Sequence, residues 1–268
     1  MPRDTLTLEQ IVTAAVELLD AEGLEGLNMR ALGNRLDSAA TAVYWHVGSK
    51  DNLVRLAADS AWHEVGLPDP SQIGWRAAAE QMATGLHAML TRHTWLVQAF
   101  GAYQLYGPGK ARHDDHALGV YEAAGFDALR AEQALTSVFT FVLGNALGPA
   151  ATVSFMRKLS RAEGDTGELT RAYRAEVAAI AKEFPRLRAR IESPAAEYGA
   201  APDDSFALGL QALLDGLENS SDRISSQTKS EQGQLPTGHL RSGEPVHGRL
   251  PQHDAQPQRP ALADDQRL

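Results

Sequence analysis

The most constraining feature of this chain is a stretch near its start in which two short helical segments meet at a tight turn. Residues 28–50 read NMRALGNRLDSAATAVYWHVGSK. The two segments break at Asp37-Ser38, and a further helix is expected to begin at Ser49-Lys50. An amphipathic helix from Leu8 to about Glu22 precedes them, because apolar residues recur there at helical spacing. This layout predicts a helix-turn-helix, whose second helix enters the major groove of DNA.

Capping residues support these boundaries. Thr7 is followed three residues later by Gln10, which is the spacing of a capping box. Good N-cap residues stand before the next three helices, namely Asn28, Ser38 and Ser49. The sequence therefore predicts a compact three-helix unit that leads into a fourth helix.

The second segment ends in Tyr44-Trp45-His46-Val47, an unusual ending because aromatic side chains are costly to leave exposed. At this point the chain resembles the tetracycline-repressor (TetR) family, whose members carry an aromatic residue here and a Lys that opens the next helix. The resemblance implies a one-component transcriptional regulator, a repressor in our interpretation, that binds a palindromic operator in double-stranded DNA. The residues that it implies at the DNA are Arg30, Ala40, Thr41, Tyr44, Trp45, His46 and Lys50. Ala40 replaces a Gln that reads a base in the namesake protein, so we expect more reliance on DNA shape.

The charge balance argues against DNA binding at first sight. The net charge is −9, and residues 1–66 hold five Lys or Arg against ten Asp or Glu. Between Asn28 and Lys50, however, three basic residues face one acidic residue. We therefore expect a local basic footprint, with modest non-specific affinity and strong salt sensitivity.

Beyond residue 66 the sequence predicts an all-α chain. Helical stripes alternate with Gly- and Pro-containing breaks, and neither period-2 runs nor hairpin turns are present. The expected helices lie at about 75–92, 95–100, 111–124, 127–150, 168–183, 185–191 and 203–219. The predicted organisation is a helix-turn-helix domain at 1–66, a larger helical effector-binding and dimerisation domain at 67–219, and a tail at 220–268. The tail lacks aromatic residues, so we expect it to be disordered.

The resemblance extends into the second domain. It implies that the helices at 127–150 and 203–219 pack against their copies in a second subunit, which makes the protein a homodimer. Glycines that would allow close helix approach fall on these two segments, namely Gly144, Gly148, Gly209 and Gly216. The alternative is that these glycines serve contacts within one chain.

The expected ligand site departs from that of the tetracycline-binding members. Where those proteins place the His, Asn, Phe, His and Glu that contact drug and metal, this chain has Gly66, Met82, Leu86, Phe100 and Gly148. Losing the His and the acid removes groups that a Mg²⁺-bound drug needs. We expect instead an apolar or aromatic small molecule in a cavity of Met82, Leu86, Met89, Phe100, Phe139 and Val142, oriented by Gln104, Tyr121, Thr140 and Asn145.

Other functions find little support. The chain has no Cys, and its sequence contains no recognisable catalytic or phosphate-binding motif, so we expect neither an enzyme nor a cofactor. No apolar run approaches a membrane span, which favours a cytoplasmic protein without membrane contact. His113-Asp114-Asp115-His116 is interpreted as a solvated helix start rather than a metal site, and His87 and His93 as polar-face residues. The alternative function is a helical ligand-binding or enzymatic module that has lost DNA binding, which the small residues Ala39-Ala40-Thr41-Ala42 favour.

Overall fold

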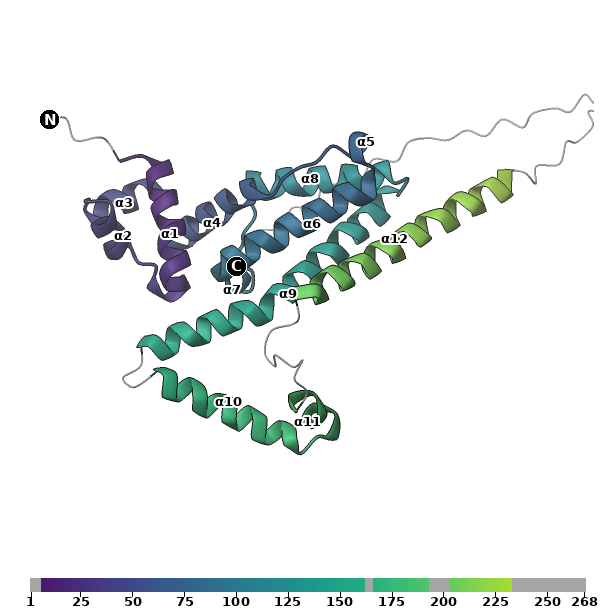
Figure 1. Cartoon of the computed structure of the whole chain (residues 1–268). Helices are drawn as coiled ribbons and strands as arrows, with labels where there is room; N and C mark the ends of the chain where they lie inside the picture. The colour runs from purple at the N-terminus through teal and green to yellow at the C-terminus, as the bar shows by residue number, and fades with distance from the viewer. Residues whose placement is uncertain (1–5, 162–165, 193–202, 233–268) are drawn as a thin grey trace, which may run out of the picture. The chain divides into compact units, whose positions relative to one another are not determined.

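The computed structural model describes residues 6–161, 166–192 and 203–232, and every regular element within these ranges is a helix (Figure 1). The predicted all-α class is therefore confirmed. The account below concerns the compact unit that ends at Gln227.

The first four helices form the reading head. They are α1 (Leu8–Gly26), α2 (Met29–Arg35), α3 (Ala40–Val47) and α4 (Lys50–Ala61). The predicted capping box is present, since the Gln10 amide donates to Thr7 Oγ1 at 3.2 Å and Gln10 Oε1 accepts from the Thr7 amide at 2.9 Å. Asn28 and Ser49 also cap their helices as predicted.

The regular helical backbone of α1 breaks at Gly23, next to the expected end near Glu22; the φ of Gly23 is 71°, which suits a residue without Cβ, and a further short turn carries α1 to Gly26. One expectation for this head was wrong. Ser38 does not cap α3, because the N-cap position falls on Ala39 and carries no side-chain hydrogen bond. The Ser38 amide instead donates to Gly33 O at 2.9 Å and closes the turn between α2 and α3.

The second part of the unit is a layered set of helices. In order these are the 3₁₀ turn η1 (Trp62–Glu64), α5 (Pro70–Ile73), α6 (Trp75–Arg92), α7 (Thr94–Ala99), α8 (Pro108–Ala123), α9 (Ala128–Arg161), α10 (Thr166–Lys182), α11 (Pro185–Ile191) and α12 (Asp203–Gln232). α6 and α11 have the predicted bounds, whereas the short α5 was not expected. α6, α8 and α9 pack on one another and form the body of this part.

Two helices run past their predicted ends. α9 was expected to stop near Ala150 but continues to Arg161 with Pro149 inside it. α12 was expected to stop at Asn219 but continues to Gln232, into the segment that the sequence analysis assigned to the tail. The rest of the predicted tail, residues 233–268, lies outside the described residues.

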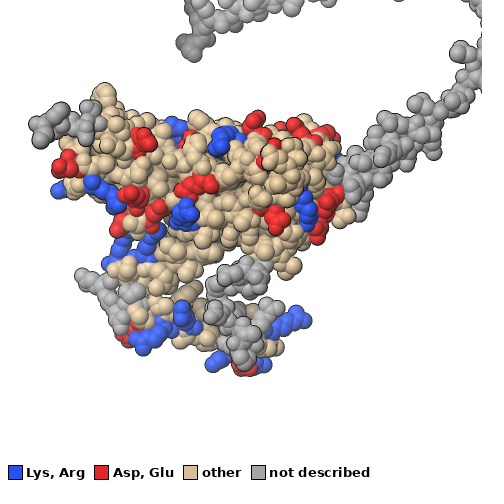
Figure 2. All heavy atoms as spheres, turned by 45° about the horizontal axis from the view of Figure 1, so that its top comes forward, with Lys and Arg blue, Asp and Glu red and all other residues tan. Residues whose placement is uncertain are grey.

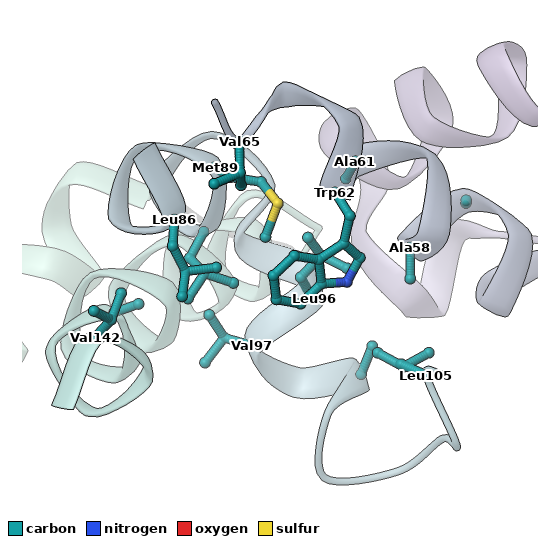
Figure 3. Close-up of a cluster of buried hydrophobic side chains, with 14 of the residues drawn as sticks. Ala58, Ala61, Trp62, Val65, Leu86, Met89, Leu96, Val97, Leu105 and Val142 are labelled. Carbon is teal, nitrogen blue, oxygen red and sulfur yellow. The ribbon is translucent and has the colours of Figure 1, made fainter. Parts of the chain in front are cut away.

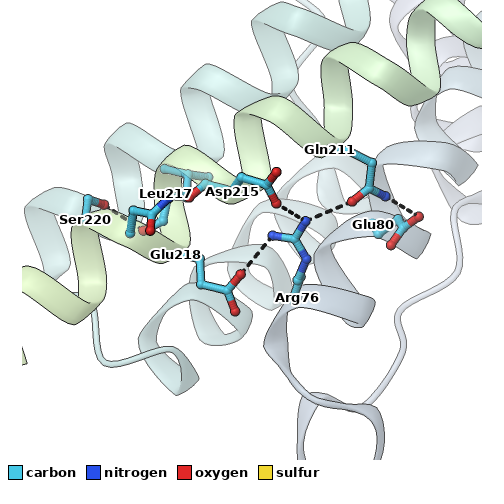
Figure 4. Close-up of polar contacts among 8 residues, drawn as sticks. Arg76, Glu80, Gln211, Asp215, Leu217, Glu218 and Ser220 are labelled. Carbon is cyan, nitrogen blue, oxygen red and sulfur yellow. Dashed lines mark hydrogen bonds and ion pairs between the residues drawn. The ribbon is translucent and has the colours of Figure 1, made fainter.

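One continuous apolar core joins the head to the second part. Trp62 is 1% exposed and lies near Ala58, Leu96 and Met89, where the end of α4 meets α6 and α7 (Figure 3). On the other side, α12 is fixed to α6 by Arg76, whose guanidinium contacts Asp215, Glu218 at 3.2 Å and Gln211 at 2.8 Å (Figure 4).

By length and composition α9 could cross a membrane, because its most apolar 18-residue window has a mean hydropathy of 1.4. This differs from the expectation that no apolar run is long enough. One such helix is weak evidence for a membrane protein, since core helices of water-soluble domains pass the same test. α9 also packs against α6, α7 and α8, although only 22% of that window is buried and the rest is partly or fully exposed.

Candidate functional site

Helix α3 presents one face to the core and the opposite face to solvent. Val43 and Val47 are buried one turn apart. Tyr44 and Trp45 are 48% and 82% exposed, although both are large and partly apolar. Exposed aromatic side chains on a short, firmly packed helix indicate a surface that binds a partner.

A tight turn holds α3 at its angle to α2. A Cβ atom on Gly33 would lie 2.7 Å from Ser38 O, so the backbones approach more closely than any larger residue allows. Asp37 follows with a φ of 47°, a left-handed conformation that Asp tolerates better than most residues. The sequence prediction included the Asp37 break but missed the role of Gly33.

The other predicted DNA-contacting residues lie around α3. Arg30 and Thr41 are exposed, and Ala40 is half-buried. His46 is half-buried, with its ring edge-on to Trp45 at a centroid distance of 4.8 Å. Lys50 Nζ donates to Leu24 O at 3.0 Å, so a phosphate would have to replace or share that bond.

The charges of the head are already partly neutralised by each other. Arg35, one of the three basic residues between positions 28 and 50, pairs with Glu17 at 2.7 Å. Acidic and basic side chains are interspersed over most of the face in Figure 2 rather than segregated into one large patch. The basic footprint on which DNA binding would depend is therefore small.

An apolar cavity lies between α6, α8 and α9. It is lined by Ala79, Met82, Ala83, Leu86, His113, Ala117, Val120, Tyr121, Leu135, Val138 and Phe139. Its volume is about 20 Å³, measured where the centre of a water-sized sphere fits. Since one water needs about 10–15 Å³ by this measure, a larger ligand enters only if side chains move.

The predicted ligand residues divide into three groups. Met82, Leu86, Tyr121 and Phe139 line this cavity. Met89 and Val142 are fully buried in the surrounding core, and Phe100 packs edge-on against the Phe139 ring. Gln104 and Thr140 are exposed, and Asn145 Nδ2 donates to Phe141 O within α9, so none of these three points polar groups into the cavity as expected.

The cavity residues that the sequence analysis missed are Ala79 and Ala83 on α6, His113, Ala117 and Val120 on α8, and Leu135 and Val138 on α9. The three on α8 follow, with the predicted Tyr121, the i, i+4, i+7, i+8 spacing of one helix face, a signal that was present in the sequence. His113 is 5% exposed, so the interpretation of this segment as a solvated helix start was wrong. Among the described residues, no cluster of His, Asp and Glu could hold a metal ion.

Two hydrogen-bond donors of this region lie on buried side chains. Burial raises the pKa of the Tyr121 phenol far above its ordinary value, so the hydroxyl stays protonated. Trp62 Nε1 is buried and has no hydrogen-bond partner among the described residues. Both are donors that a ligand acceptor could satisfy if the cavity opened.

His93 joins the reading head to the second part of the unit. Its ring is 3% exposed and lies between two carboxylates, with Nδ1 2.7 Å from Asp20 of α1 and Nε2 2.9 Å from Glu64 of η1. Burial by itself lowers the pKa of His93, but the hydrogen bonds that its ring donates to the carboxylates of Asp20 and Glu64 outweigh burial and raise the pKa above 6.5. The expectation that His93 lies on a polar face was therefore wrong.

Comparisons with known proteins agree with this arrangement. Residues 11–57 match the family described as bacterial regulatory proteins, tetR family, and residues 67–221 match the tetracyclin repressor-like C-terminal domain. The chain is 33% identical over 219 residues to the HTH-type transcriptional repressor DrrR1 of Streptomyces coeruleorubidus, covering 81% of this chain and 79% of that protein. It is 30% identical over 216 residues to the class A tetracycline repressor protein from transposon 1721 in Escherichia coli, covering 77% and 88%.

A solved structure extends the comparison to a ligand complex. The TetR family protein ActR of Streptomyces coelicolor, in complex with actinorhodin, superposes with a TM-score of 0.60 at 25% identity, over 80% of this chain and 96% of that one. Both family matches, the curated relatives and this structure agree over the head and the second part alike. The chain therefore belongs to the TetR family of bacterial transcriptional regulators.

Proposed function

We propose that this protein is a cytoplasmic, dimeric repressor that leaves a palindromic operator when a largely apolar or aromatic small molecule enters the cavity between α6, α8 and α9. The observation that carries the proposal is the exposed Tyr44-Trp45 face of α3 on the same compact unit as that cavity. DrrR1 is named a repressor, and ActR is seen with actinorhodin, which supports both halves of the proposal.

Helix α4 supplies the physical link between the two sites. Its first residue, Lys50, contacts α1 through the hydrogen bond to Leu24 O. Near its other end, Asp59 Oδ1 accepts from the Gly109 amide at 2.9 Å and the Lys110 amide at 3.3 Å, at the start of α8. Because α8 forms one wall of the cavity, a ligand that displaces α8 also moves the end of α4.

The small size of the cavity indicates which conformation binds DNA and which binds the ligand. The form with a cavity of about 20 Å³ has no room for a drug-sized molecule, so it is the form that we assign to DNA binding. A ligand shifts the equilibrium toward an opened form only by its greater affinity for that form. DNA and ligand must then weaken each other's binding by the same factor.

The proposed dimer interface is the exposed apolar surface of α9 and α12. Leu129, Leu147 and Leu208 are 64%, 55% and 74% exposed. A Cβ atom on Gly144, Gly148 or Gly216 would meet nothing within 4 Å, which leaves room for a second subunit. Gly209 differs, because a Cβ there would lie 2.6 Å from the Phe141 ring, so its role is contact within the chain.

The DNA-binding half of the proposal is tested with an operator selected from a random duplex library. We expect the double variant Tyr44→Ala, Lys50→Ala to bind this DNA at least about tenfold more weakly, because two phosphate-reaching groups are lost from each subunit. A matched double variant far from α3, Tyr173→Ala with Lys182→Ala, controls for the loss of an exposed ring and one charge.

Fluorescence anisotropy with labelled operator measures both variants, and circular dichroism checks that each remains helical. Unchanged affinity in the Tyr44, Lys50 variant would overturn the assignment of α3. Failure to select any DNA would favour the alternative, a helical ligand-binding module without DNA binding.

A further inference from the structure

The ammonium group of Lys110 lies among three aromatic rings at the first turn of α8. Its Nζ is 5.3 Å from the ring centre of Trp62, 5.6 Å from that of Tyr106 and 5.2 Å from that of Phe139. We call these three rings the aromatic cage. All three distances are within the range at which a cation is attracted to the face of a ring.

An acidic side chain completes the surroundings of the ammonium group. Lys110 Nζ is 2.6 Å from Asp114 Oδ2, and the two side chains are 18% and 19% exposed. Burial opposes the ionisation of Asp114, but hydrogen bonds from His113 and Lys110 outweigh it and hold the pKa of this carboxyl below its ordinary value. Rings together with a carboxylate form a site for a positive charge.

The cage adjoins the apolar cavity. Phe139 belongs to both, and His113, which lines the cavity, has its ring 4.8 Å from that of Trp62. Lys110 does not itself line the cavity, but its side chain is 18% exposed and has a long flexible stem, so it can leave the cage toward solvent. Its departure would empty the cage for another cation.

The charge of the site selects what can replace Lys110. Without Lys110, the carboxylates of Asp114 and Asp59 remain near the first turn of α8. An anionic ligand would meet these carboxylates, whereas an ammonium group would take over both the carboxylate and the rings. We propose that the aromatic cage is a binding subsite for an amine, with Lys110 as its internal occupant, and that the effector is an apolar or aromatic molecule carrying an ammonium group.

This inference rests on the proposed function, since it names the chemical class of the effector. It also identifies a first step in the release of DNA, namely the displacement of Lys110 from the aromatic cage. When a ligand amine expels Lys110, the altered residue is the one whose amide is held by Asp59 of α4. The exchange therefore acts directly on the contact between α8 and α4.

The test uses two probes of the same skeleton, 2-(2-naphthyl)ethylamine and 2-(2-naphthyl)ethanol, titrated calorimetrically into the full-length protein at neutral pH. We expect the amine to bind wild type about tenfold more tightly than the alcohol. Lys110→Met should raise the affinity for the amine and leave that for the alcohol nearly unchanged, because it removes the competing charge at similar size. Asp114→Asn should lower the affinity for the amine alone. Lys158→Met, an exposed lysine on α9, is the matched control and should change neither.

Equal affinities of the two probes for wild type, or no binding of either, would overturn the cage proposal, and this comparison needs no variant to fold. An amine preference that Asp114→Asn leaves intact would also overturn it. The operator assay separates the two levels of inference. If a neutral aromatic ligand releases DNA and the protein shows no preference for the amine, the cage proposal is refuted but the proposed function stands. If the protein prefers the amine but binds no DNA, the proposed function is refuted but the cage proposal stands.

Discussion

The junction at His93 leads to a prediction about pH and stability. Replacing His93 by Leu removes the ring that bridges Asp20 of α1 and Glu64 of η1. The substitution keeps similar volume in a site that is 3% exposed, so lost packing contributes little. The result should therefore report mainly on the two hydrogen bonds.

The expected loss of unfolding free energy can be worked out from the contacts of His93. A hydrogen bond to a charged group contributes about 1.5–3 kcal/mol to stability. The two carboxylate side chains are 32% and 35% exposed, so they regain water when the ring is lost, and Asp20 also keeps the Trp95 Nε1 donor at 2.8 Å. We therefore expect His93→Leu to lose about 2–3 kcal/mol of unfolding free energy at acidic pH, at or below the lower end of the roughly 3–6 kcal/mol that two such bonds would give.

The sign of the pH dependence follows from the direction of the pKa shift. The pKa of His93 is raised above 6.5 in the folded protein, so the folded state binds this proton more tightly than the unfolded chain does. The stabilisation is fully present below 6.5 and is lost as the pH rises through the folded pKa. Neutral His93 can donate to only one of the two carboxylates, so at high pH the cost of His93→Leu should shrink to about 1 kcal/mol.

Urea unfolding at about pH 5.5 and 8.5, at one fixed protein concentration, measures both values. His87→Leu is the control, because burial lowers the pKa of His87 and its contribution to stability should instead grow as the pH rises. The reasoning fails if wild type and His93→Leu show the same change in unfolding free energy between the two pH values.

Three further predictions concern the dimer, the caps and the charge of the head. Gly144→Trp should give monomers in sedimentation, whereas Gly119→Trp on α8, equally exposed and equally open, should stay dimeric; a monomeric wild type at micromolar concentration contradicts the interface. Asn28→Ala should lower the unfolding free energy by about 1 kcal/mol, while Ser38→Ala, which removes no cap, should cost far less; equal losses would show that the cap bonds do not matter. Operator affinity should fall with salt at a slope of about −4 in a double-logarithmic plot, for two phosphate-contacting cations per subunit, and a slope near −10 would reveal a much larger footprint.

The helix caps of the reading head were predictable because each cap hydrogen bond joins residues three positions apart. The caps at Thr7, Asn28 and Ser49 depend on a side chain and an amide one turn away, which the sequence displays directly. Ser38 has an equally good cap residue type, but the tight approach at Gly33 uses its amide for the turn. A cap signal is therefore reliable only where no closer backbone contact competes for the same position.

Residues whose partners lie far along the chain were misjudged. His93 contacts Asp20, which lies 73 positions away in the sequence, and no local sequence pattern around His93 predicts that contact. The extension of α9 has the same kind of cause, since Arg157 donates to Asp20 O and Arg161 to Glu22 on α1. Local propensity predicted an end near Pro149, but tertiary bonds at the far end favour a continuous helix.

The cavity was half predictable for a geometric reason. Met82 and Leu86 lie one turn apart on α6, so a single apolar stripe identified both. The wall from α8 is formed by His113, Ala117, Val120 and Tyr121. A search for apolar residues passes over His113, because its side chain is titratable. That wall is also the one that bears Lys110 and is held to α4 by hydrogen bonds. Two backbone amides at the start of α8, those of Gly109 and Lys110, thus connect the cavity wall to α4 through the Asp59 carboxylate. Because these bonds are directional, a ligand that shifts the start of α8 also displaces α4.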